Sequence, residues 1–150
     1  ADRFPGSILE THSYRGDDTA RVKKEDIVAI CTFLRDDEGL LYNFMTDLTA
    51  VDYLGKEPRF EVVYHLYSLK RNTRVRLKAG VSESDCTIDS VVPVWIGANW
   101  FEREVYDLYG ITFKGHPELR RILLYEGFEG HPLRKDYPLK KRQPLIGPVN

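Results

Sequence analysis

One charged stretch of this chain governs the interpretation of the rest, namely Asn-Trp-Phe-Glu-Arg-Glu-Val-Tyr-Asp-Leu-Tyr-Gly (99–110). Its pattern predicts a short amphipathic helix, because Phe101, Val105 and Leu108 fall on one side and form a buried stripe. Most of the remaining positions are charged or polar. The fold therefore depends on what this helix packs against and on where the chain goes after it.

Both ends of this helix carry recognisable signals. Asn99 is a suitable N-cap, and Glu102 follows three residues later, as in a capping box. Gly110 suits the position just after the last turn, where a left-handed backbone is common. We therefore expect the helix to lie between Asn99 and Gly110.

A turn-rich segment follows the helix. It contains Ile-Thr-Phe-Lys-Gly-His-Pro-Glu-Leu-Arg-Arg-Ile-Leu-Leu (111–124) and Gly-Phe-Glu-Gly-His-Pro-Leu-Arg-Lys-Asp-Tyr-Pro (127–138). Short strands are expected at 111–113 and 121–125, and the glycines and prolines predict turns elsewhere. We therefore assign 111–150 to an extended docking segment that is not an independent domain.

The chain before the helix predicts a mixed core. Apolar residues at helical spacing, from Ile27 to Leu34, predict a helix that stops at Asp37–Gly39. Alternating apolar and polar residues predict strands at 8–14, 19–22, 40–52, 60–67 and 73–79. We expect an α+β fold, with a mostly antiparallel sheet, helices on one face and a long, turn-rich C-terminal extension.

Three segments of this core are less regular. We expect 80–89 to be a polar connection, while 90–97 is consistent with either a buried strand or one helical turn. Residues 1–7 hold a proline and a glycine and are expected to form a loose tail. The predicted core domain therefore spans 1–110.

Composition excludes several classes of protein. The chain has 150 residues, of which 42% are hydrophobic and 30% charged, as in a soluble globular domain. The longest uncharged run, 90–101, is too short to span a bilayer. Cys31 and Cys86 have neither disulfide-framework nor metal-site spacing. The net charge is −1, but residues 114–142 carry eight cations against four acids, so this basic end either faces a carboxylate-rich or phosphate-rich neighbour or stays solvated.

A carboxylate and histidine cluster is one hypothesis for chemistry. Its members would be Glu102, Glu104, Asp107 and His116. Residues two apart on a helix lie about 200° apart, so Glu102 and Glu104 do not share a face. Arg103 stands one i, i+4 step before Asp107, which favours an exposed face with an ion pair. We therefore prefer a structural or interface role to catalysis or metal binding.

His116 and His131 each sit in a Gly-His-Pro turn. Two histidines placed in this way are candidate metal ligands, but no third ligand stands at a suitable spacing. The simpler interpretation is that proline restrains the turn and the imidazole hydrogen-bonds the backbone. We favour that interpretation.

The cations of the C-terminal segment suggest a nucleic-acid surface as a second alternative. Aromatic residues are interleaved with them, and the set is Arg120, Arg121, Arg134 and Lys135 with Tyr125, Phe128 and Tyr137. Against this interpretation stand a sequence pI near 6.5 and the absence of any RNP, KH or helix-turn-helix pattern. No dinucleotide-binding, Walker A or nucleophile-elbow motif is present either. The residues alone favour a partner surface.

Three segments resemble a known family. Glu-Arg-Glu-Val-Tyr-Asp-Leu-Tyr (102–109), followed at fixed spacing by His116 and Arg120, resembles the motif of the C subunit family of NADH-quinone oxidoreductase, respiratory complex I. Asp-Leu-Thr-Ala-Val-Asp-Tyr-Leu (47–54) and Gly-His-Pro-Leu-Arg-Lys-Asp-Tyr-Pro-Leu (130–139) are similar to its recurring segments. The resemblance covers about 20–139.

The resemblance implies a non-catalytic subunit of the peripheral arm, in a complex that passes electrons from NADH to quinone and translocates ions. It implies packing against the large D subunit and near the B and I subunits, on the cytoplasmic or matrix side of the membrane. FMN, iron–sulfur clusters and quinone would be bound by other subunits, and no cofactor or metal by this chain. A similar subunit of a membrane-bound hydrogenase or another electron-input complex is the alternative.

The family motifs, carried onto this sequence, define a structural and docking set with no catalytic member. We expect it to comprise Glu102, Arg103, Glu104, Asp107, His116, Arg120, Arg121, His131, Arg134, Lys135 and Asp136.

Overall fold

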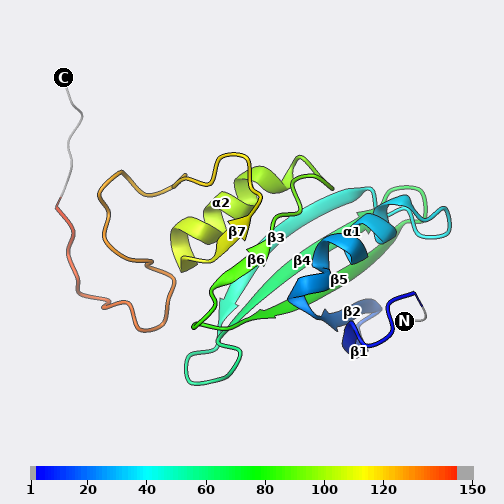
Figure 1. The fold of residues 1–150 in the computed structure, drawn as a ribbon, viewed down its shortest axis with the longest axis horizontal. Coiled ribbons are helices and arrows are strands. Elements are labelled where there is room, and N and C mark those ends of the chain that lie inside the picture. Colours follow the sequence, from blue (N-terminus) through cyan, green and yellow to red (C-terminus); the bar gives the residue numbers. More distant parts are fainter. Residues whose placement is uncertain (1–2, 145–150) are drawn as a thin grey trace.

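A computed structural model describes residues 3–144 (Figure 1). The elements in chain order are β1 (Ile8–Tyr14), β2 (Asp17–Val22), the 3-10 turn η1 (Lys24–Asp26), α1 (Ile27–Asp36), β3 (Phe44–Asp52), β4 (Phe60–Ser68), β5 (Thr73–Val81), β6 (Thr87–Asp89), α2 (Ala98–Tyr109) and β7 (Thr112–Lys114). Five strands form one sheet in the order β1-β2-β5-β4-β3, and β6 and β7 form a separate pair. The predicted α+β fold is confirmed.

The sheet owes its core face to the alternation of side chains along its strands. Phe60, Val62 and Tyr64 on β4 are all fully buried on this face, and Leu77 and Ala79 of β5 lie opposite them. β3, β4 and β5 pair antiparallel, as the expected mostly antiparallel sheet requires. Because these apolar side chains lie on one face of the sheet, the helices pack on that face.

β2 joins the sheet in a way that the sequence did not indicate. It pairs parallel with β5, with Ala20 opposite Leu77 and Val22 opposite Ala79. The hairpin partner β1 therefore becomes an edge strand, and α1 carries the chain to β3 at the other edge. Because this is the one parallel pairing in the described five-stranded sheet, the prediction of a mostly antiparallel sheet holds.

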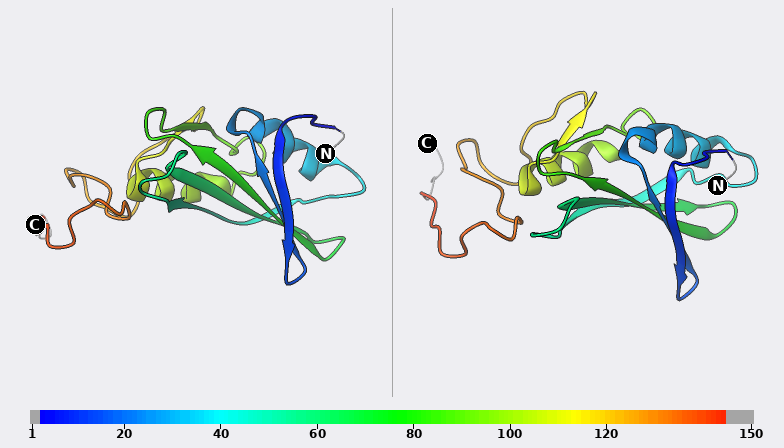
Figure 2. Two further views of the ribbon diagram at one scale, coloured as in Figure 1. Left: turned by 90° about the horizontal axis from the view of Figure 1, so that it is seen from below. Right: turned by 60° about the horizontal axis from the view of Figure 1, so that its bottom comes forward.

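Both described helices cover the same face of the sheet (Figure 2). α1 buries Ile27, Ile30 and Cys31, and α2 buries Ala98 and Val105, so that one hydrophobic core lies between helices and strands. Among the described residues, neither helix is long and apolar enough to cross a membrane.

One prediction for the segment before α2 needs correction. Residues 87–89, expected to be part of a polar connection, form β6, which pairs parallel with β7 through Ile88 and Phe113. Both of these side chains are buried, so the pair adds to the core although each strand has only three residues. The ambiguous stretch 90–97 forms turns, in which the Val94 and Trp95 amides donate to the Val91 carbonyl.

The predicted strand at 121–125 is absent, since this segment has no strand partner in the structure.

At the other end of the chain, Phe4 packs edge-on against Phe33 of α1, with ring centroids 5.6 Å apart. Residues 1–2 and 145–150, which belong to the expected tail and docking segment, lie outside the described residues.

Candidate docking site on helix α2 and the C-terminal arm

Gly110 ends α2 and allows the C-terminal arm, defined here as residues 115–144, to pass close to the helix. Its φ is 75°, and its N–H donates to the Tyr106 carbonyl at 2.9 Å. A Cβ at this position would lie 2.5 Å from His131 Nε2 and 2.8 Å from Arg134 Nη2. Glycine is therefore required both by the backbone conformation and by the arm that lies over it. The predicted helix end is confirmed.

The Asp107 carboxylate holds the beginning of the arm. It is 0% exposed, and its Oδ2 accepts the backbone N–H groups of Ile122, Leu123 and Leu124 at 3.1, 2.9 and 2.9 Å. Arg121 Nη1 lies 2.8 Å from Oδ1. Burial alone would raise the pKa of Asp107, but the three amides and Arg121 outweigh it and hold the pKa below its ordinary value. These amides point at a carboxylate, which explains why 121–125 forms no strand.

Arg103 holds the arm from another side of the same helix. Its Nε donates to the Arg120 carbonyl and its Nη2 to the Arg121 carbonyl, both at 3.1 Å. The predicted Arg103–Asp107 ion pair on an exposed face is therefore wrong, because both side chains are buried beneath the arm. The prediction from helical spacing assumed that these charged side chains face solvent. Their actual partners come from residues 120–124, which the fold brings over the helix.

Glu102 is fully buried and faces the turn before α2. It accepts a hydrogen bond from Ser90 Oγ at 2.6 Å and another from the Val91 N–H at 2.7 Å. Burial raises its pKa to about 7, although both hydrogen bonds act in the opposite direction. The predicted capping box is wrong, since the helix begins at Ala98 and no side chain caps it. Glu102 instead ties α2 to β6 through the residues that follow that strand.

Both histidines bond the backbone, as predicted, although their partners include α2. His116 Nε2 lies 3.0 Å from the Asn99 carbonyl, while its Nδ1 accepts the Glu118 N–H at 3.0 Å, which requires the neutral tautomer protonated on Nε2. His131 Nδ1 donates to the Asp107 carbonyl at 2.9 Å. Burial, and then the nearby arginines, lower the pKa of His131. Within residues 3–144, no three histidine, cysteine or acidic side chains are grouped as metal ligands are.

The end of the arm is held by an ion-pair cluster at the ends of β3 and β4. Arg59 is buried and binds Asp52 through Nε and Nη2 at 3.0 and 2.9 Å. The same guanidinium binds Asp136 of the arm at 2.8 Å, and the Lys135 N–H donates to Asp52 at 2.8 Å. Arg59 therefore joins the arm to the sheet. Hydrogen bonding to Arg59 lowers the pKa values of both Asp52 and Asp136.

Sequence reasoning missed Arg59 and the role of Asp52. Asp52 lies in the segment 47–54 that resembles the family, which was a usable signal, whereas nothing in the pattern marked Arg59. Arg134, which was predicted, donates from Nε to the Tyr109 carbonyl at 2.6 Å and lies over the Phe60 ring. The predicted set thus mainly holds this chain's own arm in place.

The remaining predicted residues lie on the outside. Arg120 pairs with Glu118 at 3.0 Å, and both side chains are exposed. The side chains of Glu104 and Lys135 make no hydrogen bond or ion pair with any other described residue. The aromatic residues that suggested nucleic acid instead contact one another, Phe128 packing on both Tyr125 and Tyr137.

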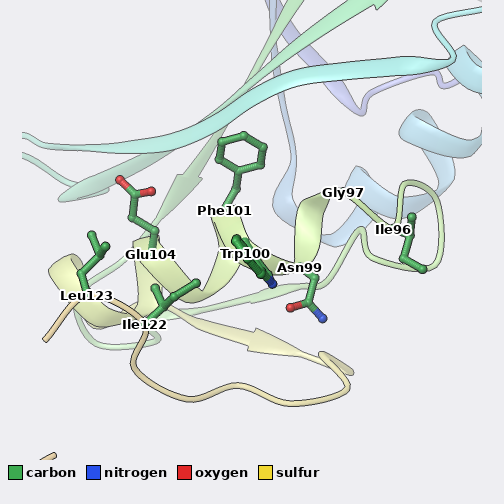
Figure 3. A pocket seen from close by; sticks show the side chains of 8 residues that line it. All are labelled: Ile96, Gly97, Asn99, Trp100, Phe101, Glu104, Ile122 and Leu123. Atoms are coloured by element: carbon green, nitrogen blue, oxygen red, sulfur yellow. The ribbon is translucent and has the colours of Figure 1, made fainter. Parts of the chain in front are cut away.

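A groove of about 730 Å³ runs along the outer side of α2 (Figure 3). Ile96, Trp100 and Leu123 line it and are 86%, 71% and 61% exposed, and Phe101 and Ile122 complete its apolar surface. The sequence holds one signal for this groove that was not used. Trp100 falls outside the buried stripe of the predicted helix, so a large aromatic side chain lies on its exposed side. Exposed apolar side chains gathered in this way mark a candidate interaction site.

Comparison with known proteins identifies relatives over almost the whole chain. The model of the family described as respiratory-chain NADH dehydrogenase, 30 Kd subunit, matches residues 20–143. The chain is 57% identical over 148 residues to the C subunit of NADH-quinone oxidoreductase from Geotalea uraniireducens, covering 97% of this chain and 89% of that protein. It is 56% identical to the same subunit of Geobacter metallireducens, covering 97% and 91%.

Solved structures share the fold. A trypsin-resistant fragment of Nqo5 aligns with a TM-score of 0.65 and 32% identity, covering 73% of this chain and 89% of the fragment. A chain of an archaeal membrane-bound sulfane sulfur reductase aligns with a TM-score of 0.76 over 91% of this chain and 80% of its own. At 23% identity, this second likeness concerns the fold alone.

Proposed function

This chain belongs to the family of the 30 kDa subunit of respiratory-chain NADH dehydrogenase, and we propose that it acts as the C subunit of an NADH-quinone oxidoreductase. The observation that carries this proposal is the similarity to C subunits of that enzyme at 56–57% identity, which extends over about nine tenths of each protein. The role is that of a peripheral-arm subunit in an enzyme that transfers electrons from NADH to quinone.

Within that complex we assign the chain a structural role rather than a catalytic one. Two charged residues of its family motif hold the arm, Asp107 through three amides and Arg103 through two carbonyls. The histidines hydrogen-bond the backbone, and burial raises the pKa of Cys31 and of Cys86, which makes both thiols poor nucleophiles. On this proposal FMN, the iron–sulfur clusters and quinone belong to other subunits.

The arm is the proposed contact with the D subunit, and the B and I subunits are proposed as neighbours on the cytoplasmic side of the membrane. It is fixed near its start by Asp107 and further along by Arg59, so its outer surface is presented in one arrangement. That surface includes Leu133, Leu139 and the basic residues Lys140, Lys141 and Arg142, all exposed. Pre-ordering of this kind reduces the entropy lost when a partner binds.

The proposal is tested by gene replacement. In a bacterium whose own gene for the C subunit is deleted, an affinity-tagged copy of this chain should restore NADH:quinone activity in membranes. The tagged chain should also purify with the D, B and I subunits and with the absorbance of iron–sulfur clusters. Purification of the tagged chain alone, from membranes that do not regain activity, would contradict the proposal.

A further inference from the structure

The groove along α2 combines an apolar surface with one carboxylate. Figure 3 shows Ile96 at one end and Leu123 at the other, with Trp100 between them and Glu104 at the Leu123 end. Glu104 is exposed and has no hydrogen-bond or ion-pair partner among residues 3–144. It thus differs from Glu102, Arg103 and Asp107 of the same motif, which are buried and bonded within the chain.

Three apolar side chains of this groove contribute little to the core. Ile96, Trp100 and Leu123 all keep more than half of their surface in solvent. They are contiguous along one groove, whereas isolated exposed apolar residues are ordinary on a protein surface. Tryptophan at the centre of such a patch is also the residue type most often found to dominate the affinity of an interface.

We propose that this groove binds an apolar segment of another subunit of the oxidoreductase, and that a lysine or arginine of that segment pairs with Glu104. The inference rests on the proposed function, which supplies a multi-subunit setting, and it places a second contact on α2 and the beginning of the arm, apart from the basic surface at 140–142. Trp100 is the central anchor and Glu104 sets the register, because an unpaired carboxylate beside apolar surface favours a cationic partner.

The charges of the groove decide against three other occupants. Its lining contains Glu104 but no lysine or arginine, so an isologous contact with a second copy would bring two carboxylates together without a cation. A membrane with anionic headgroups would meet the same carboxylate and be repelled. A small apolar ligand would leave Glu104 unpaired, whereas a protein segment with a cation satisfies both features.

The test uses membranes from a strain that lacks its own gene for the C subunit, to which the purified chain is added back and its binding titrated. Trp100→Ala should raise the apparent Kd about 30-fold, the fold-change of a hot-spot truncation of about 2 kcal/mol. Glu104→Lys should raise it at least tenfold, and Glu104→Gln by a smaller factor. Tyr14→Ala, an exposed aromatic on β1, and Leu69→Ala, in the β4–β5 turn, should bind as the wild type does.

A photo-reactive amino acid at position 100 identifies what fills the groove in the assembled complex. Cross-linking to a segment of another subunit that carries a lysine or arginine supports the inference. Cross-linking to a second copy, to lipid or to a small molecule overturns it, as do wild-type affinities for both Trp100→Ala and Glu104→Lys. In each of those cases, if the wild-type chain still assembles and restores activity, the proposed function stands and only this site fails.

Discussion

Asp107 and Arg121 lie fourteen residues apart and form a 2.8 Å ion pair in which the carboxylate is completely buried. The same carboxylate also accepts three consecutive backbone amides from residues 122–124. A single side chain of α2 therefore neutralises one cation and satisfies three donors that would otherwise lack partners. These bonds to Asp107 fix the path of the beginning of the arm.

Replacing Asp107 should destabilise the fold. In Asp107→Asn one of the two acceptor oxygens becomes an NH2 donor, so either Arg121 or the three backbone N–H groups lose their acceptor, and the Arg121 charge is no longer balanced. We expect the free energy of unfolding to fall by about 3 kcal/mol, measured by urea denaturation. Glu118→Gln, which breaks the exposed pair with Arg120, is the control and should cost less than about 1 kcal/mol. Equal losses in the two variants would contradict the assigned role.

Glu102 should make stability depend on pH. Its carboxyl has a pKa of about 7 in the folded chain against an ordinary value of 4.5, so between these values the folded state holds the extra proton. Its contribution is therefore complete below pH 4.5 and is lost as pH rises through 7, by up to about 3 kcal/mol.

Glu102→Gln isolates this contribution, because glutamine keeps the shape and cannot titrate. The difference in unfolding free energy, variant minus wild type, should rise between pH 5 and pH 8. Taking differences is needed because the lowered pKa values of Asp52 and Asp107 act in the opposite sense, weakening the fold in acid. A difference that stays flat across this pH range for Glu102→Gln would refute the prediction.

The two acidic partners of Arg59 should have different effects. Asp52 should mainly stabilise the fold, and Asp136 should mainly hold the arm. Asp52→Asn removes a buried partner of Arg59 and should lower the unfolding free energy by about 3 kcal/mol. Asp136 is half exposed, so Asp136→Asn should cost at most about 1 kcal/mol.

Trypsin gives the complementary measurement for Asp136→Asn. Cleavage at Lys135 and Lys140 should become several-fold faster, since the arm loses its side-chain bond to the sheet. Cleavage at Arg15 in the β1–β2 turn should keep its wild-type rate and provides the internal control. An unchanged cleavage pattern would show that Asp136 does not hold the arm.

Gly110→Ala should be destabilising for two separable reasons. The positive φ at this position should lower the unfolding free energy of the alanine variant by about 1–2 kcal/mol. The new Cβ would also collide with His131. His131→Ala removes the obstructing ring, so the double variant should be more stable than the sum of the two single effects by about 1 kcal/mol. Thermal unfolding of the four proteins measures this coupling, and strict additivity would rule out the collision as a cause.

Much of the fold could be predicted from the sequence because its signals are local. The alternation along β4 and β5 and the left-handed glycine at 110 depend on neighbouring residues, and both predictions are confirmed. The parallel pairing of β2 with β5 was not accessible, since nothing near β2 indicates which strand it will join. β6 and β7 were obscured because three residues carry too little alternation.

Sequence reasoning selected several residues that hold the arm, but it did not give their arrangement. The motif identified Glu102 and Asp107, yet Glu102 was expected in a capping box and Asp107 in an ion pair on an exposed face, while the structure buries both. Their partners, Ser90, the Val91 amide and the amides of 122–124, lie eleven to seventeen residues away and belong to segments without regular structure. Trp100 was passed over for the opposite reason, because an exposed aromatic does not contribute to a core pattern.

The bonds that Asp136 and Lys135 make at the sheet bridge 77 and 83 positions of the chain. A protein is synthesised from its N-terminus at about 5–20 residues per second. The sheet and its buried Asp52–Arg59 pair are therefore complete in sequence long before the ribosome delivers Asp136. Closure of the arm is necessarily a late event in the life of each new molecule, so a surface that depends on it can recruit a neighbour only after Asp136 itself has emerged.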